Sequence, residues 1–181
     1  MDFNILYAIQ SIRTPILDNI ILALTKIMGS YGEIWLIVAA ILLIFRKTRK
    51  CGICILISYA LVYLVGQFGL KDLIARPRPC HLDETVALLV ERPESFSCPS
   101  THSAWAFAAA VSIFYYFRKP GIAVIAVAAV IGFSRMYLFV HFPTDVLLGI
   151  VLGVLMALIT CKLTDRILKK RQDAKKRKTE A

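Results

Sequence analysis

Three short clusters of basic, histidine and hydroxyl side chains interrupt a sequence made largely of apolar runs. The first cluster has Lys71 and Arg78, separated by six residues, with Pro79 following the arginine. A lysine at the end of a helix and an arginine in the loop after it can converge on one anion. The planar guanidinium fork makes two hydrogen bonds to adjacent phosphate oxygens, which suits it to this task. The same spacing also fits basic side chains that only extend from helix ends toward an interface.

The second cluster is Pro99-Ser100-Thr101-His102. A proline followed by serine and threonine is typical of a helix start, where free backbone N–H groups form a ready site for a phosphate. Ser100 either caps the helix or reaches the anion. His102 is expected one turn from that site, where it could transfer a proton, although a histidine after an ordinary cap would look the same.

The third cluster is Ser134-Arg135, followed after five residues by His141 and after three more by Asp145. His141 and Asp145 are four residues apart, as in the first turn of a helix, so the carboxylate can accept a hydrogen bond from one imidazole nitrogen. That bond would fix the tautomer and leave the other nitrogen as a nucleophile. Alternatively, Asp145 is only a favourable negative charge at a helix N-terminus.

The elements that must position these clusters are apolar helices. The chain of 181 residues is 58% hydrophobic and 19% charged, with a mean hydropathy of +0.68. This composition excludes intrinsic disorder and argues against a compact water-soluble globule. Residues 51–70 carry no charge, and a helix of this length rises about 30 Å, the thickness of the hydrocarbon core.

We therefore predict a single all-α domain over residues 1–181, a polytopic membrane bundle of about six transmembrane helices. The predicted spans are the runs with few or no charges, at residues 14–30, 34–45, 51–70, 101–117, 120–134 and 146–161. Asp18 and Lys26 interrupt the first run and must face a partner helix or an interface. Isoleucines at helical spacing predict an amphipathic interfacial helix over residues 2–12.

The basic residues are sorted by loop, which predicts the orientation. Of the 22 Lys and Arg, 15 lie in three segments: residues 46–50, 118–119 and the tail at 162–181. All three fall on one side of a six-span chain, and the positive-inside rule places that side in the cytoplasm. Both termini are then expected to be cytoplasmic, with the three clusters on the outer face of the plasma or inner membrane. The tail fits a solvated helix end near anionic headgroups better than a nucleic-acid-binding segment.

Together and in this order, the clusters resemble the type-2 phosphatidic acid phosphatase family, whose pattern is K-x6-R-P, P-S-G-H and S-R-x5-H-x3-D. The motifs run from residue 71 to 145, and Thr101 replaces the usual glycine. This threonine could narrow the pocket or add a hydroxyl contact. The chain is also similar to the small bacterial undecaprenyl-diphosphatases of this family.

The resemblance implies a role for each matching residue. Lys71, Arg78 and Arg135 would bind the phosphate, and Ser100 would add a hydrogen bond. His141 would attack phosphorus to form a phosphohistidine, oriented by Asp145. His102 would protonate the departing oxygen and then activate water. No metal or other cofactor is implied, since three cations can neutralise the charge on the transferred group.

Two cysteines directly flank the first two motifs. Cys80 follows Arg78-Pro79, and Cys98 precedes Pro99-Ser100, so a disulfide between them could clamp the motifs together in an oxidising environment. Reduced thiols are the alternative. Cys51 and Cys54 form a C-x-x-C pair at the start of an apolar run and are interpreted as small buried residues rather than a zinc or redox site.

The sequence therefore predicts a membrane lipid phosphatase whose partners are the bilayer and a phosphorylated lipid. Undecaprenyl pyrophosphate is the favoured substrate, and phosphatidylglycerophosphate or phosphatidic acid the alternative, because the motifs recognise phosphate and not the lipid tail. Transfer of the phosphoryl group to another lipid is a second enzymatic alternative. A non-catalytic anion channel lined by Lys71, Arg78 and Arg135 is an alternative from a different class, but it would not need a paired His141 and Asp145. The oligomeric state stays open.

Overall fold

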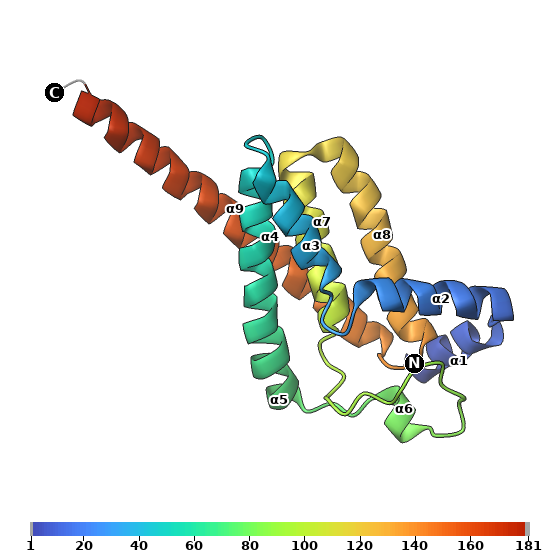
Figure 1. Ribbon diagram of the computed structural model, residues 1–181. Coiled ribbons are helices and arrows are strands. Elements are labelled where there is room, and N and C mark those ends of the chain that lie inside the picture. The colour runs from blue at the N-terminus through green and yellow to red at the C-terminus, as the bar shows by residue number, and fades with distance from the viewer. Residues whose placement is uncertain (1, 180–181) are drawn as a thin grey trace.

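The computed structural model describes residues 2–179, with side chains as far as residue 174, and this part of the chain is helical without strands. Its elements, shown in Figure 1, are α1 (Asp2–Ser11), α2 (Pro15–Met28), α3 (Ile34–Ile44), α4 (Arg49–Val62), the π-helix η1 (Tyr63–Leu70), α5 (Lys71–Ile74), α6 (Pro79–Leu82), α7 (Thr101–Tyr116), α8 (Arg118–Tyr137) and α9 (Pro143–Thr179). α4, η1 and α5 form one continuous helical segment. The predicted all-α bundle is confirmed.

α7 is the central helix and packs against α4, α8 and α9. Its alanines, including Ala104 and Ala108, are buried on several sides. On α9, Gly149 and Gly153 face the α7 backbone so closely that an added Cβ would collide with the carbonyl oxygens of Ser100 and Ala104. Small residues let helices approach closely where apolar lipid tails offer no hydrophobic driving force for packing. This contact holds the start of α7 against the start of α9, where two of the three motifs lie.

Among the described residues, three helical segments are long and apolar enough to cross a membrane: Arg49–Leu82, Arg118–Tyr137 and Pro143–Ala174. They contain the spans predicted at residues 51–70, 120–134 and 146–161. The span predicted at 34–45 forms the shorter apolar helix α3. The span predicted at 101–117 forms α7, whose 16 residues are fewer than the roughly 20 needed to cross the hydrocarbon core.

The first predicted span, residues 14–30, differs from the prediction. It forms α2, which lies across one end of the bundle next to α1 instead of running alongside α7 and α8 (Figure 1). The interrupting charge explains this placement. Asp18 accepts a hydrogen bond from the hydroxyl of Tyr137, at 2.6 Å, and forms an ion pair with Arg13 at 3.2 Å. The first contact ties α2 to the end of α8, and the second ties it to the turn between α1 and α2.

The two ends of the chain lie at opposite ends of the bundle (Figure 1). Asp2 pairs with Arg76 at 2.9 Å, beside α6, whereas α9 runs away from this region toward the C-terminus. The prediction that both termini share the side opposite the motifs is therefore wrong for the N-terminus, because it counted residues 14–30 as a span. The three basic segments do lie together, at the end remote from α6. We call the end with the three basic segments the tail end, and the opposite end, with the motifs, the α6 end.

Candidate active site

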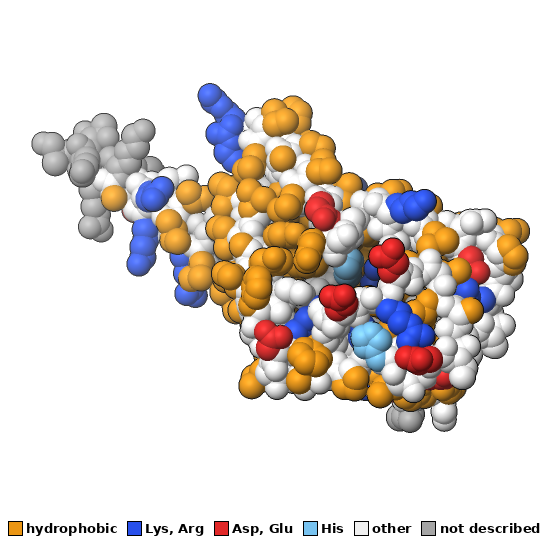
Figure 2. Space-filling view, turned by 60° about the horizontal axis from the view of Figure 1, so that its bottom comes forward, with side chains coloured by type: hydrophobic (Ala, Val, Ile, Leu, Met, Phe, Trp, Pro, Cys, Tyr) orange, Lys and Arg blue, Asp and Glu red, His pale blue; other side chains and the backbone are white. Residues whose placement is uncertain are grey.

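A cavity of about 950 Å³ opens at the α6 end of the bundle. Its walls come from α2, the end of the η1–α5 segment, the loop before α7, the start of α7 and the end of α8. Figure 2 shows basic, acidic and histidine side chains gathered around a hollow on this face. Six of the eight predicted site residues line the cavity: Lys71, Arg78, Thr101, His102, Arg135 and His141. The other two, Ser100 and Asp145, lie behind its wall.

The loop before α7 holds the two cations of the first motif. Arg78 donates from Nε to the carbonyl oxygen of Ser95 at 2.6 Å and from Nη1 to that of Val140 at 2.9 Å. The Oγ of Ser95 accepts from Arg78 Nη2 at 3.0 Å and from Lys71 Nζ at 3.3 Å. Neither cation has a carboxylate partner within the described part of the chain, so both charges remain available to an anion. Sequence reasoning missed Ser95, which lies in a loop without a motif.

Arg135 is positioned by a residue from α2. Its Nη2 donates to the Oγ1 of Thr25 at 2.9 Å, and its Nε donates to the Oγ of Ser134 at 3.1 Å. Only 4% of Arg135 is exposed. The sequence signal for Thr25 is weak, since it is one hydroxyl in an apolar run, next to the charged Lys26. α2, taken for a span, therefore supplies part of the site.

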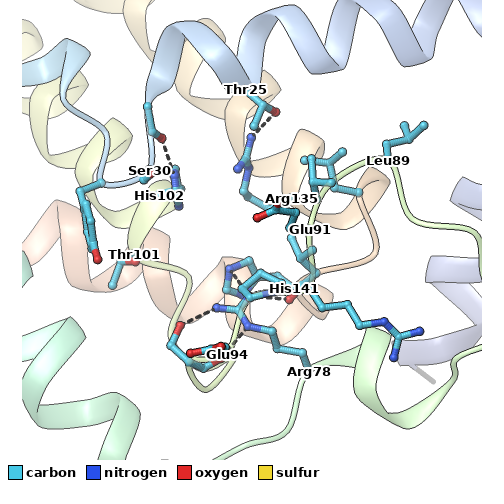
Figure 3. Close-up of a pocket in the computed structure, with 18 of the residues that line it drawn as sticks. Thr25, Ser30, Arg78, Leu89, Glu91, Glu94, Thr101, His102, Arg135 and His141 are labelled. Atoms are coloured by element: carbon cyan, nitrogen blue, oxygen red, sulfur yellow. Dashed lines mark hydrogen bonds between the residues drawn. The ribbon is translucent and has the colours of Figure 1, made fainter.

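His141 lies beside Arg78 in the wall of the cavity (Figure 3). Its Nε2 is 3.2 Å from Arg78 Nη1, and because a guanidinium only donates, Nε2 must be the accepting nitrogen. The proton is then on Nδ1, on the side of Asp145. Burial lowers the pKa of His141 to about 3, an effect that Arg78 strengthens and Asp145 opposes. The ring is therefore neutral near pH 7, with a lone pair on Nε2.

The predicted pairing of His141 with Asp145 is a longer contact than expected. Nδ1 of His141 is 3.8 Å from Oδ2 of Asp145, beyond hydrogen-bond length, and has no hydrogen-bond partner. The same Oδ2 accepts the backbone N–H of Phe142 at 2.8 Å. Asp145 is fully buried and lies on the Nδ1 side of the ring, behind the wall of the cavity.

His102 faces His141 across the cavity, beneath α2 (Figure 3). Its Nε2 is 3.2 Å from the carbonyl oxygen of Gly29, and since a carbonyl only accepts, this nitrogen carries a proton. Nδ1 is then the nitrogen left to take up a proton or give one. Gly29 ends α2 with a φ of 72°, a conformation that favours glycine. The turn after α2 thus orients the second histidine.

The two residues at the start of α7 differ in their placement. Thr101 lines the cavity, whereas Ser100 is fully buried with its Oγ 3.0 Å from the Oγ of Ser103. The N–H of Ser100 donates to the backbone oxygen of Asp145 at 3.0 Å. The expected hydrogen bond from the Ser100 side chain to the anion is therefore not supported, because its hydroxyl is turned toward α7.

The disulfide considered between Cys80 and Cys98 is absent, and both are buried free thiols. Cys80 packs in an apolar cluster with Leu6 and Tyr137. Cys98 instead contacts Asp145, and burial together with this carboxylate raises the pKa of the Cys98 thiol to about 11. The two thiols have different surroundings, and packing holds the motifs together without a bridge.

Three cations that form no salt bridge with any described residue share the cavity with a neutral histidine and a second histidine, which suits the binding of a phosphate and the transfer of its phosphoryl group. Comparison with known proteins agrees with this chemistry. The PAP2 superfamily profile matches residues 52–169. An undecaprenyl-diphosphatase of Sulfolobus acidocaldarius is 32% identical over 139 residues, which cover 75% of this chain and 67% of that protein. Phosphatidylglycerophosphatase B of Bacillus subtilis is 33% identical over 174 residues, covering 89% and 82%.

Solved structures of similar proteins share the fold. Aquifex aeolicus LpxE superimposes with a TM-score of 0.73 at 28% identity, covering 89% of this chain and 94% of that one. A transmembrane PAP2 type phosphatidylglycerolphosphate phosphatase from Bacillus subtilis gives a TM-score of 0.70 at 30% identity, covering 92% and 85%. These relatives are enzymes, so the alternative of a non-catalytic channel is set aside. The chain belongs to the PAP2 superfamily, among its membrane lipid phosphatases.

Proposed function

We propose that this protein hydrolyses the diphosphate headgroup of undecaprenyl diphosphate to undecaprenyl phosphate and inorganic phosphate. One observation carries the chemistry: Lys71, Arg78 and Arg135 line one cavity with a neutral His141, and none of the three has a carboxylate partner among the described residues. Buried cations without counter-ions retain their attraction for an anion. The histidine beside them can attack the phosphorus that they hold.

The proposed reaction has two steps. In the first, the three cations hold the terminal phosphate while the Nε2 lone pair of His141 forms a bond to phosphorus. The bridging P–O bond breaks, and His102, which is protonated on Nδ1 in the substrate complex, gives that proton to the departing oxygen. Asp145, on the Nδ1 side, stabilises the positive charge that the ring acquires. In the second step, His102 takes a proton from water, the water oxygen attacks phosphorus, and the P–N bond breaks to release phosphate and free His141.

Lys26 on α2 supports a diphosphate over a monophosphate. It lines the cavity and lies between Thr25, which contacts Arg135, and Gly29, which contacts His102. It forms no salt bridge in the part of the chain that the structure describes. Because His102 is proposed to protonate the leaving group, Lys26 is on the leaving-group side. A lipid phosphate leaves with negative charge for a lysine to stabilise, whereas an alcohol does not.

A substrate panel tests this proposal. Purified protein without added metal is incubated with undecaprenyl diphosphate, phosphatidylglycerophosphate or phosphatidic acid, and released phosphate is measured. We expect the highest kcat/KM for the diphosphate, and we expect Lys26→Met to lower that value about tenfold while leaving the monoesters within twofold. Lys119→Met, at the tail end, is the matched control. Faster phosphate release from phosphatidylglycerophosphate, with no effect of Lys26→Met, would favour a phosphatidylglycerophosphatase instead. The Bacillus subtilis relatives support this second candidate.

We further propose that the α6 end faces the outside and the basic tail end faces the cytoplasm. The positive-inside rule supports this orientation, because residues 46–50, residues 118–119 and the tail share one end. All five native cysteines are buried, so single exposed cysteines can be introduced. On intact cells, an impermeant maleimide should label Ser11→Cys on α1 but label Lys170→Cys only after permeabilisation. The reverse pattern would invert the orientation.

A further inference from the structure

Arg76 contacts the buried carboxylate behind His141, although it is one of the six unspecified residues between Lys71 and Arg78 in the first motif. Its Nη1 donates to Oδ1 of Asp145 at 2.7 Å and to Oγ1 of Thr144 at 2.6 Å. Its Nη2 donates to Oδ2 of Asp2 at 2.9 Å. The guanidinium carbon is 4.0 Å from the centre of the Phe142 ring, so the group is also stacked. The side chain is therefore held in one orientation.

These contacts explain how a fully buried carboxylate remains charged and fixed. Asp145 has one partner on each oxygen: Arg76 on Oδ1 and the N–H of Phe142 on Oδ2. A buried carboxylate without a cation would be costly and would tend to take up a proton. Arg76 supplies that cation from the side away from the cavity. By holding the Asp145 carboxylate, Arg76 fixes the position of the negative charge behind His141.

Asp2 balances Arg76 from the start of the chain. Its Oδ2 accepts from Arg76 and also from Oγ1 of Thr144, at 2.7 Å, so the three side chains close a triangle of hydrogen bonds. Hydrogen bonds from Arg76 and Thr144 hold the pKa of Asp2 below its usual value, so Asp2 is ionised at neutral pH. Arg76 thus divides its charge between two carboxylates. Asp2 lies outside residues 52–169, the part of the chain that the family profile matches.

We propose that Arg76 is a positioning residue that orients Asp145, and through it His141, and that Asp2 tunes this effect by sharing the Arg76 charge. The inference deepens the proposed function, since it rests on the roles of His141 and Asp145 given there. It makes α1 part of the catalytic apparatus. The competing explanation is that Asp2 only anchors α1 to the bundle.

The chain offers a matched control for that explanation. α1 has a second anchor, in which the hydroxyl of Tyr7 donates to Oδ2 of Asp83 at 2.7 Å. Asp83 is in an exposed region, and neither Asp83 nor Tyr7 contacts Asp145 or lines the cavity. Asp83→Asn therefore loosens α1 without changing the charge near His141. Asp2→Asn loosens α1 and changes that charge.

The experiment measures kcat and KM across pH for Arg76→Gln, Arg76→Lys, Asp2→Asn and Asp83→Asn, with both undecaprenyl diphosphate and phosphatidylglycerophosphate. Arg76→Gln should lower kcat about 10- to 100-fold with KM within twofold, and Arg76→Lys should restore part of the loss. Asp2→Asn should have a smaller effect, and Asp83→Asn should leave kcat within twofold. Size-exclusion chromatography checks that each variant is folded. If Arg76→Gln does not fold, Arg76→Lys and Asp2→Asn carry the test.

The pH profile separates positioning from anchoring. On the acid side of the pH profile, kcat falls as His141 takes up a proton. The midpoint of this acid limb reports the pKa of His141 in the substrate complex. The other charged or titratable groups that face His141 are Lys71, Arg78, His102 and Asp145. Removing the Arg76 cation should move this limb to higher pH. Removing Asp2 leaves the cation less compensated and should move the limb to lower pH. Opposite shifts are not expected from a loosened helix.

Three results would overturn the inference: an unchanged limb with full kcat in Arg76→Gln, an unchanged limb in Asp2→Asn, or an Asp83→Asn variant that reproduces the effects of Asp2→Asn. Failure of the substrate proposal is distinguishable, because a preference for phosphatidylglycerophosphate leaves these expected shifts unaltered. Full activity of His141→Ala would remove the proposed nucleophile and this inference with it.

Discussion

The bundle has a polar cluster at each end, and the two differ in how their charges are matched. At the tail end, Asp165 accepts hydrogen bonds from the hydroxyls of Tyr115 and Tyr116, both at 3.2 Å, and Tyr116 lies 3.5 Å from the sulfur of Cys54. This cluster has one acid and hydroxyl groups that solvate it. At the α6 end, Lys71, Arg78 and Arg135 line a cavity and have no acid as a partner among the described residues.

The tail-end cluster is suited to holding helices together, whereas the cations at the α6 end are suited to binding a ligand. Hydrogen-bonded polar groups inside a bundle contribute to the stability of the fold because their charges and dipoles are already satisfied. Cations that hydrogen-bond to backbone and hydroxyl oxygens and form no salt bridge among the described residues keep most of their attraction for an anion from outside. Positions in the two clusters should therefore respond differently to substitution, in activity at one end and in stability at the other.

The largest effect is expected at His141. His141→Ala removes the only proposed nucleophile, so phosphate release should fall at least about 10⁴-fold, while the protein keeps its elution volume in detergent. With substrate labelled at the terminal phosphate, the wild type should retain label on the protein after an alkaline quench, which preserves a phosphohistidine, and the variant should retain none. Retained turnover would contradict the assignment and would place the nucleophile elsewhere in the cavity.

His102→Ala should have the next largest effect. Loss of a general acid typically costs about 10² to 10⁴ in rate, and the loss should be smaller for a substrate whose leaving group needs no proton. Comparing a lipid monophosphate with p-nitrophenyl phosphate measures this dependence. An equal loss for both substrates would argue that His102 binds phosphate instead of donating a proton.

Thr25→Val tests the contribution of α2 to the cation cluster. The substitution removes the hydroxyl that accepts from Arg135 but keeps the volume, so the guanidinium should lose its orientation and kcat/KM should fall about tenfold. Thr25→Ser retains the acceptor and should stay within twofold. If both variants behave like the wild type, α2 does not position Arg135 in the working enzyme.

The smallest effect on activity is expected at the tail end. Tyr116→Phe removes a hydroxyl that donates to Asp165, which should cost about 1 to 3 kcal/mol of stability and lower the Tm by several degrees. Phosphate release below the new Tm should stay within twofold of the wild type. A loss of activity comparable to that of Thr25→Val would mean that the two ends are coupled through α7.

Features read from local patterns were predicted well. Uncharged runs at 51–70, 120–134 and 146–161 form long helices, and the three motifs supply six of the cavity-lining side chains. The physical reason is that length, apolarity and spacing along one helix or turn are properties of neighbouring residues. Contacts over long sequence distances were not predictable in this way. Neither the hydrogen bond from Arg135 to Thr25 nor that from His102 to the carbonyl oxygen of Gly29 has a clear signature in the sequence.

The sequence by itself determined that the protein is an α-helical membrane protein, which residues could handle a phosphate, and which loops share one side. The tertiary structure decided how residues 14–30 are used, because only packing shows that Asp18 is bound at the end of α8 and that the helix lies across the bundle. It also decided that Ser100 turns inward, that Cys80 and Cys98 stay apart, and that Asp2 meets Arg76 behind Asp145. Each of these depends on the surroundings of a side chain, which residues distant in the sequence create.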